Sequence, residues 1–337
     1  MKKIILLIIS TLIFYSCETD IEINMPNQEN KLVVNSQIES NTYSSPFNNQ
    51  NVLVSNSISA LGSVEEYVYT DDSIPVINYA LVTIDEINAS TYEVINNYPL
   101  SFDDVCYCYV NRDFIPESGK TYNLNVNAEG FPPITAIETI PSPPEYIISD
   151  FYMRSDIDNN FESHLLAYDL CELSITIKDN PNEKNYYKLK VFAGREAQNL
   201  QGLTFRQKSC WYKVADPSFL TSINRHSESD NYFEGKNGYF TDDFFNGEEK
   251  TFFIEVDKPE GAWTYFYIEL SSYSENLYQF ILTKKEGKID EDNILFNNEA
   301  LFIQSNIDNG YGVFGSKGVS RKAYLPLLYP TNGWLDY

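Results

Sequence analysis

The stretch Tyr122-Asn123-Leu124-Asn125-Val126-Asn127 decides the fold class of this chain. An apolar side chain stands at every second position with an asparagine after each, and successive side chains of a strand point to opposite faces of a sheet. The segment therefore predicts a strand with one buried and one solvated face, as antiparallel sheets have. Three further segments show the same period, with apolar positions at Leu173, Ile175 and Ile177, at Tyr187, Leu189 and Val191, and at Phe266, Ile268 and Leu270.

One stretch, Tyr273 to Glu286, has helical periodicity instead. The stripe expected to face inward consists of Leu277, Phe280, Ile281 and Lys284. These residues are spaced by three and four positions, as on one face of a helix. Ser272 and Glu275 have the spacing of a capping box, and Gly287 is a residue type that commonly follows the last turn. We therefore predict one short helix in an otherwise β-rich chain.

The composition is that of a folded β protein and excludes several classes. Of the 337 residues, 43% are hydrophobic and 21% charged, which is typical of globular domains and not of disordered tails, collagen-like fibres or polytopic membrane proteins. The 26 Tyr and 21 Phe favour strands. The 48 acidic residues against 24 Lys and Arg give a formal net charge of −24, so the surface repels phosphate backbones and no nucleic-acid partner is expected.

A proline-rich run divides the strand series. Residues 140–146 include Pro141, Pro143 and Pro144, which cannot donate ladder hydrogen bonds, and we predict a linker there. Residues 31–139 have the size and strand spacing of an immunoglobulin-like or transthyretin-like β-sandwich. Residues 147–337 are expected to form a larger antiparallel β domain that contains the helix.

The first sixteen residues have the pattern of an export signal. Lys2 and Lys3 precede a short apolar run that is too short for a permanent membrane span. Ser16 and Cys17 follow, and this junction resembles the lipobox of bacterial lipoproteins, which implies that Cys17 becomes the lipidated first residue of the mature chain. The alternative is a plain secretory signal with an incidental cysteine.

Residues 17–30 are polar and are expected to form a flexible acidic tether. Glu18, Asp20 and Glu22 lie directly after the cysteine and resemble the signal that directs Bacteroidota lipoproteins to the outer face of the outer membrane. We therefore expect a lipid-anchored protein of the outer membrane, on the extracellular side. A solvated linker is the alternative interpretation of the same acids.

The other cysteines are disulfide candidates, because an even number in an exported chain favours disulfides. They are Cys106, Cys108, Cys171 and Cys210. Cys106 and Cys108 lie two apart on a predicted strand, so their side chains share one face and are not expected to pair with each other. Bridges to Cys171 and Cys210 are expected instead. No cysteine pair has the spacing of a structural zinc site.

The sequence carries no catalytic fingerprint. The G-x-S-x-G, H-E-x-x-H, P-loop and dinucleotide-binding patterns are absent. Asp156-Ile157-Asp158-Asn159-Asn160 begins like a calcium loop but fails the EF-hand pattern, because Phe161 and Ala167 replace the required glycine and glutamate. We expect no metal or other cofactor, although an irregular calcium site stays open. A hydrolase that uses two acids brought together by the fold also stays open.

Several segments together resemble a known family. They are the lipobox Cys17, the strands 31–35, 80–84 and 134–136, Asn185-Tyr186-Tyr187, Cys210-Trp211, Phe244-Phe245-Asn246-Gly247 and the glycine-rich 306–315. Their order resembles the domain-of-unknown-function 4249 family, which consists of Bacteroidota outer-membrane lipoproteins. Its members are typically encoded beside TonB-dependent transporters of the SusC/RagA type. The resemblance implies an accessory role but carries over no catalytic residues.

Two classes of function follow. The first is a non-enzymatic accessory subunit that docks on a TonB-dependent β-barrel transporter and helps in substrate capture or gating. Tyr265 and Tyr267, on the polar register of their strand, are candidate contacts, with core packing between two sheets as the alternative. The second is a surface hydrolase, or a glycan-binding or adhesion protein.

Overall fold

A computed structural model describes residues 30–40, 50–57, 75–154, 170–199, 202–224, 231–257, 265–291, 303–324 and 334–336. Strands dominate these segments, and the mainly β prediction is confirmed. The strands are β1 (Leu32–Ser40), β2 (Asn51–Asn56), β3 (Leu81–Ile87), β4 (Val94–Asp103), β5 (Cys108–Val110), β6 (Thr121–Asn127), β7 (Ile134–Thr139), β8 (Glu145–Arg154), β9 (Leu170–Lys178), β10 (Tyr186–Asn199), β11 (Gly202–Ser209), β12 (Trp211–Val214), β13 (Phe233–Gly235), β14 (Gly238–Thr241), β15 (Glu249–Asp257), β16 (Tyr265–Tyr273), β17 (Tyr311–Tyr324) and β18 (Trp334–Asp336). The described residues also form a 3₁₀ turn, Pro217–Phe219, and a single α-helix, α2 (Glu275–Glu291).

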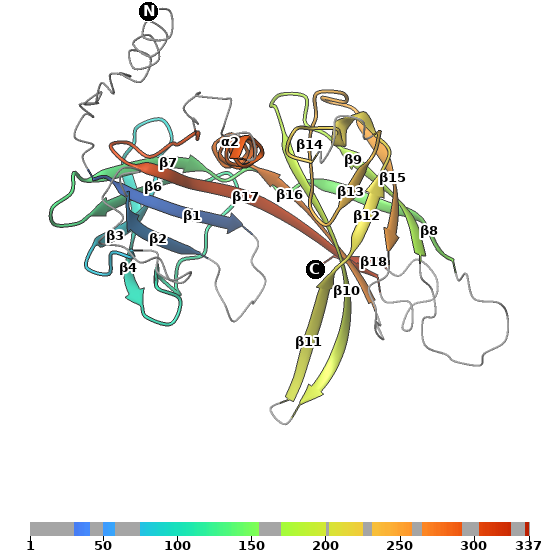
Figure 1. The fold of residues 1–337 in the computed structure, drawn as a ribbon, viewed down its shortest axis with the longest axis horizontal. Coiled ribbons are helices and arrows are strands. Elements are labelled where there is room, and N and C mark those ends of the chain that lie inside the picture. The colour runs from blue at the N-terminus through green and yellow to red at the C-terminus, as the bar shows by residue number, and fades with distance from the viewer. Residues whose placement is uncertain are drawn as a thin grey trace, which may run out of the picture. The chain divides into compact units, whose positions relative to one another are not determined.

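The N-terminal strands fold around one core (Figure 1). Strand β4 passes between two layers, because its first part pairs with β3 and its last residues pair with β5. Along the sheet the strands follow the order β17-β1-β2-β5-β4-β3-β6-β7. Asp308, just before β17, bridges back to Thr135 of β7. The curled sheet thus nearly closes on itself, an arrangement compatible with the predicted sandwich.

A parallel pair of strands connects the N-terminal and C-terminal regions of the sequence. Strand β17 lies parallel to β1, with Gly312 opposite Val34. Gly312 has φ of +101°, and a Cβ there would clash with the carbonyl oxygen of Val34, so glycine is required. Ile307 and Phe314 lie in the N-terminal core although they come from the C-terminal region. The predicted boundary at 140–146 stays a prediction, but residues from both sides of it share one sheet and one core.

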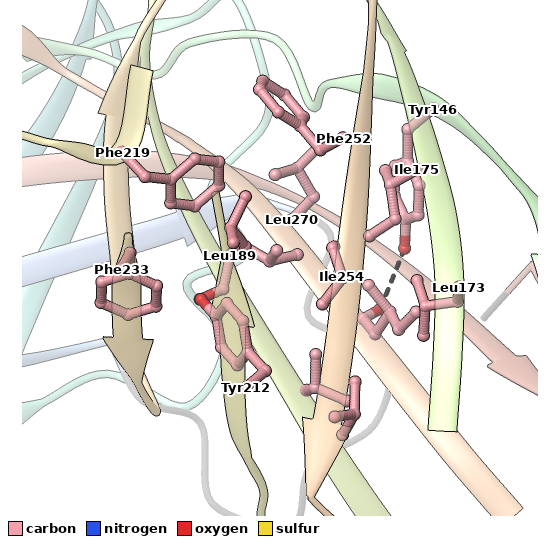
Figure 2. Close-up of a cluster of buried hydrophobic side chains, with 14 of the residues drawn as sticks. Tyr146, Leu173, Ile175, Leu189, Tyr212, Phe219, Phe233, Phe252, Ile254 and Leu270 are labelled. Atoms are coloured by element: carbon pink, nitrogen blue, oxygen red, sulfur yellow. Dashed lines mark hydrogen bonds between the residues drawn. The ribbon is translucent and has the colours of Figure 1, made fainter. Parts of the chain in front are cut away.

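The second core lies between β10 and β16 of the large sheet and a five-stranded sheet of order β13-β12-β15-β9-β8. The predicted alternation holds here, since the apolar residues of β9, β10 and β16 named from the sequence are all buried. Figure 2 shows Tyr146 reaching across this core, where its hydroxyl donates to the carbonyl of Ile268 at 2.9 Å. The Tyr212 hydroxyl donates to the carbonyl of Leu189 at 2.6 Å. Buried tyrosines therefore connect the two sheets by hydrogen bonds.

The helix begins and ends at different residues from those predicted. Tyr273 belongs to β16, and the backbone N–H of Leu277 donates to the Ser274 hydroxyl at 3.4 Å, so Ser274 is the cap and the predicted Ser272 cap is wrong. Gly287 lies inside α2 and does not end it. The helix packs Leu277 and Tyr278 against the large sheet.

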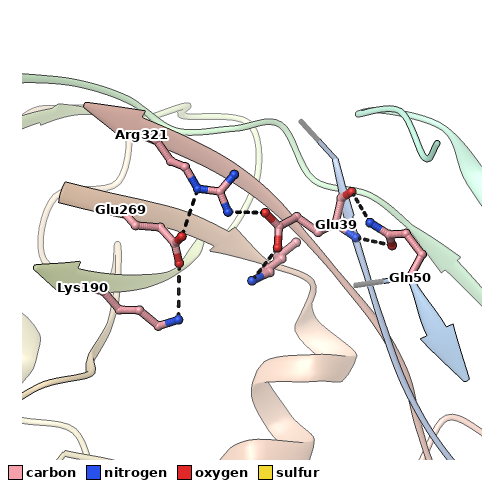
Figure 3. Close-up of polar contacts among 6 residues, drawn as sticks. Glu39, Gln50, Lys190, Glu269 and Arg321 are labelled. Carbon is pink, nitrogen blue, oxygen red and sulfur yellow. Dashed lines mark hydrogen bonds and ion pairs between the residues drawn. The ribbon is translucent and has the colours of Figure 1, made fainter. Parts of the chain in front are cut away.

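A charged network lies on the strands that join the two cores (Figure 3). Arg321 of β17 pairs with Glu39 of β1 and donates from Nε to Glu269 of β16 at 3.1 Å. Lys317 pairs with Glu39 at 2.8 Å, and Lys190 of β10 pairs with Glu269 at 3.4 Å. Both carboxylates are buried. Each has two cationic partners, which compensate the cost of burying its charge.

Candidate functional site

A cavity formed by described residues lies on the outer face of the five-stranded sheet. Its volume is about 800 Å³, and we call it the sheet groove. It is lined by Glu172, Leu173, Ser174, Lys213, Ala215, Tyr232, Phe253, Ile254 and Glu255. A concave site of this volume has the size of a small-ligand pocket.

Strand alternation places Ser174, Lys213, Phe253 and Glu255 on the outer face, while Leu173 and Ile254 belong to the core beneath. Phe252, Ile254 and Val256 of β15 are buried in the core beneath, so Phe253 between them points outward and is 75% exposed. Ser174 of β9 stands opposite Phe253 in the register. A large exposed aromatic ring in the middle of a sheet contributes nothing to the core, which makes it a candidate contact for a ligand or partner.

A row of charged residues crosses the same face. Glu255 stands opposite Lys213 on one side and opposite Glu172 on the other. The Lys213 Nζ lies 3.9 Å from Glu255 and 4.0 Å from Glu234, both at the long limit of an ion pair between partly exposed groups. Such pairs contribute at most about 1 kcal/mol and exchange readily for contacts with a ligand. The groove therefore offers two carboxylates and one ammonium group beside an aromatic ring.

This arrangement suits binding more directly than it suits catalysis. Phe253 and Tyr232 offer apolar surface, while Glu172 and Glu255 accept hydrogen bonds from hydroxyl or ammonium groups. The one catalytic feature is that these two carboxylates face each other across β9 and β15. Among the described residues, no group of three His, Cys, Asp or Glu side chains has the arrangement of a metal site.

The cysteine pairing expected from the sequence is wrong. Cys106 and Cys108 form a disulfide with each other, at a Cα–Cα distance of 5.3 Å. Residues 104–107 form a turn instead of the predicted strand, and Tyr107 has φ of +51°, so the extended geometry that argued against this pair does not apply. Cys171 and Cys210 are free thiols buried in the second core.

The other residues named from the sequence divide into two groups. Cys17, Glu18, Asp20 and Glu22 lie outside the residues that the structure describes, and so do the acids at 156–160. Tyr267 is only 9% exposed and packs against Phe192, because both faces of β16 are covered. Core packing is therefore correct for Tyr267, and its expected role as a surface contact is wrong. The side chain of Tyr265 is not among those that the structure describes.

No motif in the sequence indicates the sheet groove, but one clue to it is present. In Thr251-Phe252-Phe253-Ile254-Glu255-Val256 the apolar period falls on even numbers, and Phe253 is the only apolar residue of the odd register. The period alone predicts an outward aromatic ring there. The pairing of Glu172 with Glu255 has no such signature, since it depends on which strands become neighbours.

The comparison with known families agrees with the sequence segments quoted above. A family model described as "Domain of unknown function (DUF4249)" matches residues 18–323. The chain belongs to the DUF4249 family. The matched range of this DUF4249 protein includes both cores and the whole sheet groove. No curated protein matches the chain. In the part of the chain that the structure describes, no helix is both long and apolar enough to cross a membrane.

Proposed function

We propose that this protein is a surface-exposed outer-membrane lipoprotein that acts as a non-enzymatic accessory subunit of a TonB-dependent transporter of the SusC/RagA type. In this proposal Cys17 carries the lipid, and Glu18, Asp20 and Glu22 direct the protein to the extracellular face. The observation that carries it is the sheet groove, an open site of about 800 Å³ with an exposed aromatic ring and polar groups on a rigid sheet. Its role is substrate capture or gating.

The groove supports a binding role in two ways. Phe253 is a large apolar contact whose conformation the strand already restricts, so binding loses little conformational entropy. Glu172, Glu255 and Lys213 surround it with both signs of charge, which orients a polar ligand or a loop of a partner. At full extension the 13 residues from Glu18 to Asn30 reach at most about 45 Å, so the start of the folded part stays within that distance of the membrane that would hold the barrel.

Co-purification from native outer membranes in mild detergent, with mass spectrometry of the eluate, tests the proposal. We expect a stoichiometric TonB-dependent barrel to elute with the wild-type protein. Phe253→Ala should lose the barrel if the groove docks on it, or keep the barrel and slow uptake if the groove captures substrate. Phe244→Ala is the matched control, because Phe244 is 66% exposed and does not line the groove. A protein that elutes alone even after cross-linking would refute the accessory role.

A second candidate is a surface hydrolase. Directly opposed residues of antiparallel strands have Cβ atoms about 5 Å apart, which lets the side chains of two glutamates bring their carboxyl groups to the roughly 5 Å separation of retaining glycosidases. The opposed Glu172 and Glu255 are the acids this function would use. Turnover by the wild type in a hydrolase screen would favour this function if Glu172→Gln and Glu255→Gln each abolish that turnover. Binding in a glycan array without turnover would favour a glycan-binding or adhesion protein.

A further inference from the structure

A second cavity is enriched in lysine. It has a volume of about 470 Å³ and lies between β10, β12, β13, β14 and α2, and we call it the lysine pocket. Among its lining residues are Lys188, Lys236 and Lys285, the aromatic side chains of Trp211 and Tyr239, and Glu234. None of these residues lines the sheet groove.

None of the three lysines has a carboxylate partner among the described residues. The Nζ of Lys188 lies 4.7 Å from the ring centroid of Tyr239, and the Nζ of Lys236 lies 5.6 Å from that of Trp211. Lys285 donates to a backbone carbonyl. All three side chains are half-buried. Aromatic rings and a carbonyl therefore hold the ammonium groups in place without neutralising them.

The neighbouring lysine on the same strand shows the contrast. Lys190, two residues along β10, pairs with Glu269 at 3.4 Å. Glu269 also accepts from Arg321, so this carboxylate already has two cationic partners, and among the described residues it forms no ion pair with Lys188. Burial, together with Lys190 and Lys317 nearby, lowers the pKa of Lys188 to about 7. Among the described residues, the positive charge around Lys188 therefore exceeds the negative charge, and a bound anion would favour the charged form of Lys188.

The local charge is the reverse of that of the chain. Acids outnumber bases by 48 to 24 over the whole sequence, yet the described residues that line the lysine pocket include three lysines and one acid. That acid, Glu234, is shared with Lys213 outside the pocket. Placing half-buried cations together with fewer acids costs stability, and an anion entering from solvent reduces that cost.

We propose that the lysine pocket binds a small organic anion. Its carboxylate or sulfonate would pair with Lys188, Lys236 and Lys285, and its apolar or aromatic body would lie against Trp211 and Tyr239. The pocket volume suits a ligand of that size and excludes a folded partner. The inference does not depend on the accessory role, because it uses none of the sheet-groove residues.

Calorimetry with two probes that share one ring system tests the proposal on the full-length protein in detergent. The probes are 2-naphthoate, an anion, and 2-naphthylmethylamine, a cation. We expect 2-naphthoate to bind with a Kd of about 1 mM or tighter and about tenfold more tightly than the amine. No detectable binding of 2-naphthoate would overturn the proposal. Equal affinity for the two probes in a Phe253→Ala protein would also overturn it, and this variant is used because the sheet groove of the wild type can bind the amine.

Lysine variants locate the binding. Lys188→Met and Lys236→Met should each weaken 2-naphthoate binding about tenfold and leave binding of the amine unchanged or stronger. Lys178→Met is the matched control, since Lys178 is an exposed strand lysine that does not line the pocket. Lys236→Met provides the test on its own if Lys188→Met fails to fold. Wild-type affinity for 2-naphthoate in a folded Lys236→Met protein would show that the anion binds elsewhere.

Discussion

Replacing Glu269 with glutamine tests how the charged network stabilises the fold. Glu269 is 7% exposed and lies between Lys190 and Arg321 on strands that join the two cores. Glu269→Gln keeps the shape of the side chain and removes its charge. Lys190 and Arg321 then lose a carboxylate partner in a buried site, which is costly because the remaining charges are not compensated.

The pKa of Glu269 gives the expected magnitude. Burial alone would raise this pKa, but Lys190, Lys317 and Arg321 lower it from 4.5 to about 2. Since the folded value lies below the unfolded value, the ionised carboxylate stabilises the fold above about pH 4.5. That stabilisation disappears as the pH falls toward 2. The difference corresponds to about 3 kcal/mol of unfolding free energy at pH 7.

Urea unfolding followed by tryptophan fluorescence measures this effect at two pH values. We expect Glu269→Gln to be about 3 kcal/mol less stable than wild type at pH 7, with the gap reduced by about half at pH 3. Glu249→Gln, at an exposed position of β15, is the matched control and should change stability by less than about 0.5 kcal/mol. A gap below about 1 kcal/mol at pH 7, or the same gap at both pH values, would refute the reasoning.

Three further changes have defined outcomes in the same urea assay. Gly312→Ala should cost more than about 3 kcal/mol, because its Cβ would clash with β1 at positive φ. Tyr212→Phe should cost about 2 kcal/mol, since its hydroxyl bonds two buried backbone groups, at 2.6 and 2.7 Å. Burial raises the pKa of Glu138 to about 7, so the folded form holds a proton that the unfolded chain releases. Wild type should therefore lose about 2 kcal/mol more than Glu138→Gln between pH 5 and pH 8.

Period-two alternation predicted the strand content because it is a local property of the sequence. Leu124, Ile175, Leu189 and Ile268 are all buried as their positions in the alternation required. The same rule applied to Phe253 would have predicted its exposure. Alternation correctly assigns the face of a side chain wherever only one face of a strand is covered. It fails at Tyr267, where both faces are covered.

The parts that could not be predicted depend on long-range pairing or on local backbone conformation. Nothing in the sequence of β1 or β17 states that Val34 will stand beside Gly312, because that register follows from the packing of the whole core. The Cys106–Cys108 bridge depends on Tyr107 adopting positive φ, which a tyrosine seldom does. The strand register and the disulfide can therefore be established only from the three-dimensional structure.

The two cavities differ in charge, and the difference determines what each selects. The described lining of the sheet groove has Glu172 and Glu255 with one lysine, so it disfavours anions and accepts neutral or cationic groups. The lysine pocket, as its described residues line it, has three lysines with one acid and favours the opposite class. A single titration with the anionic and cationic naphthalene probes therefore reports on both sites. Phe253→Ala should change only the response to the amine, and Lys236→Met should weaken only the response to the acid, because the two sites share no lining residue.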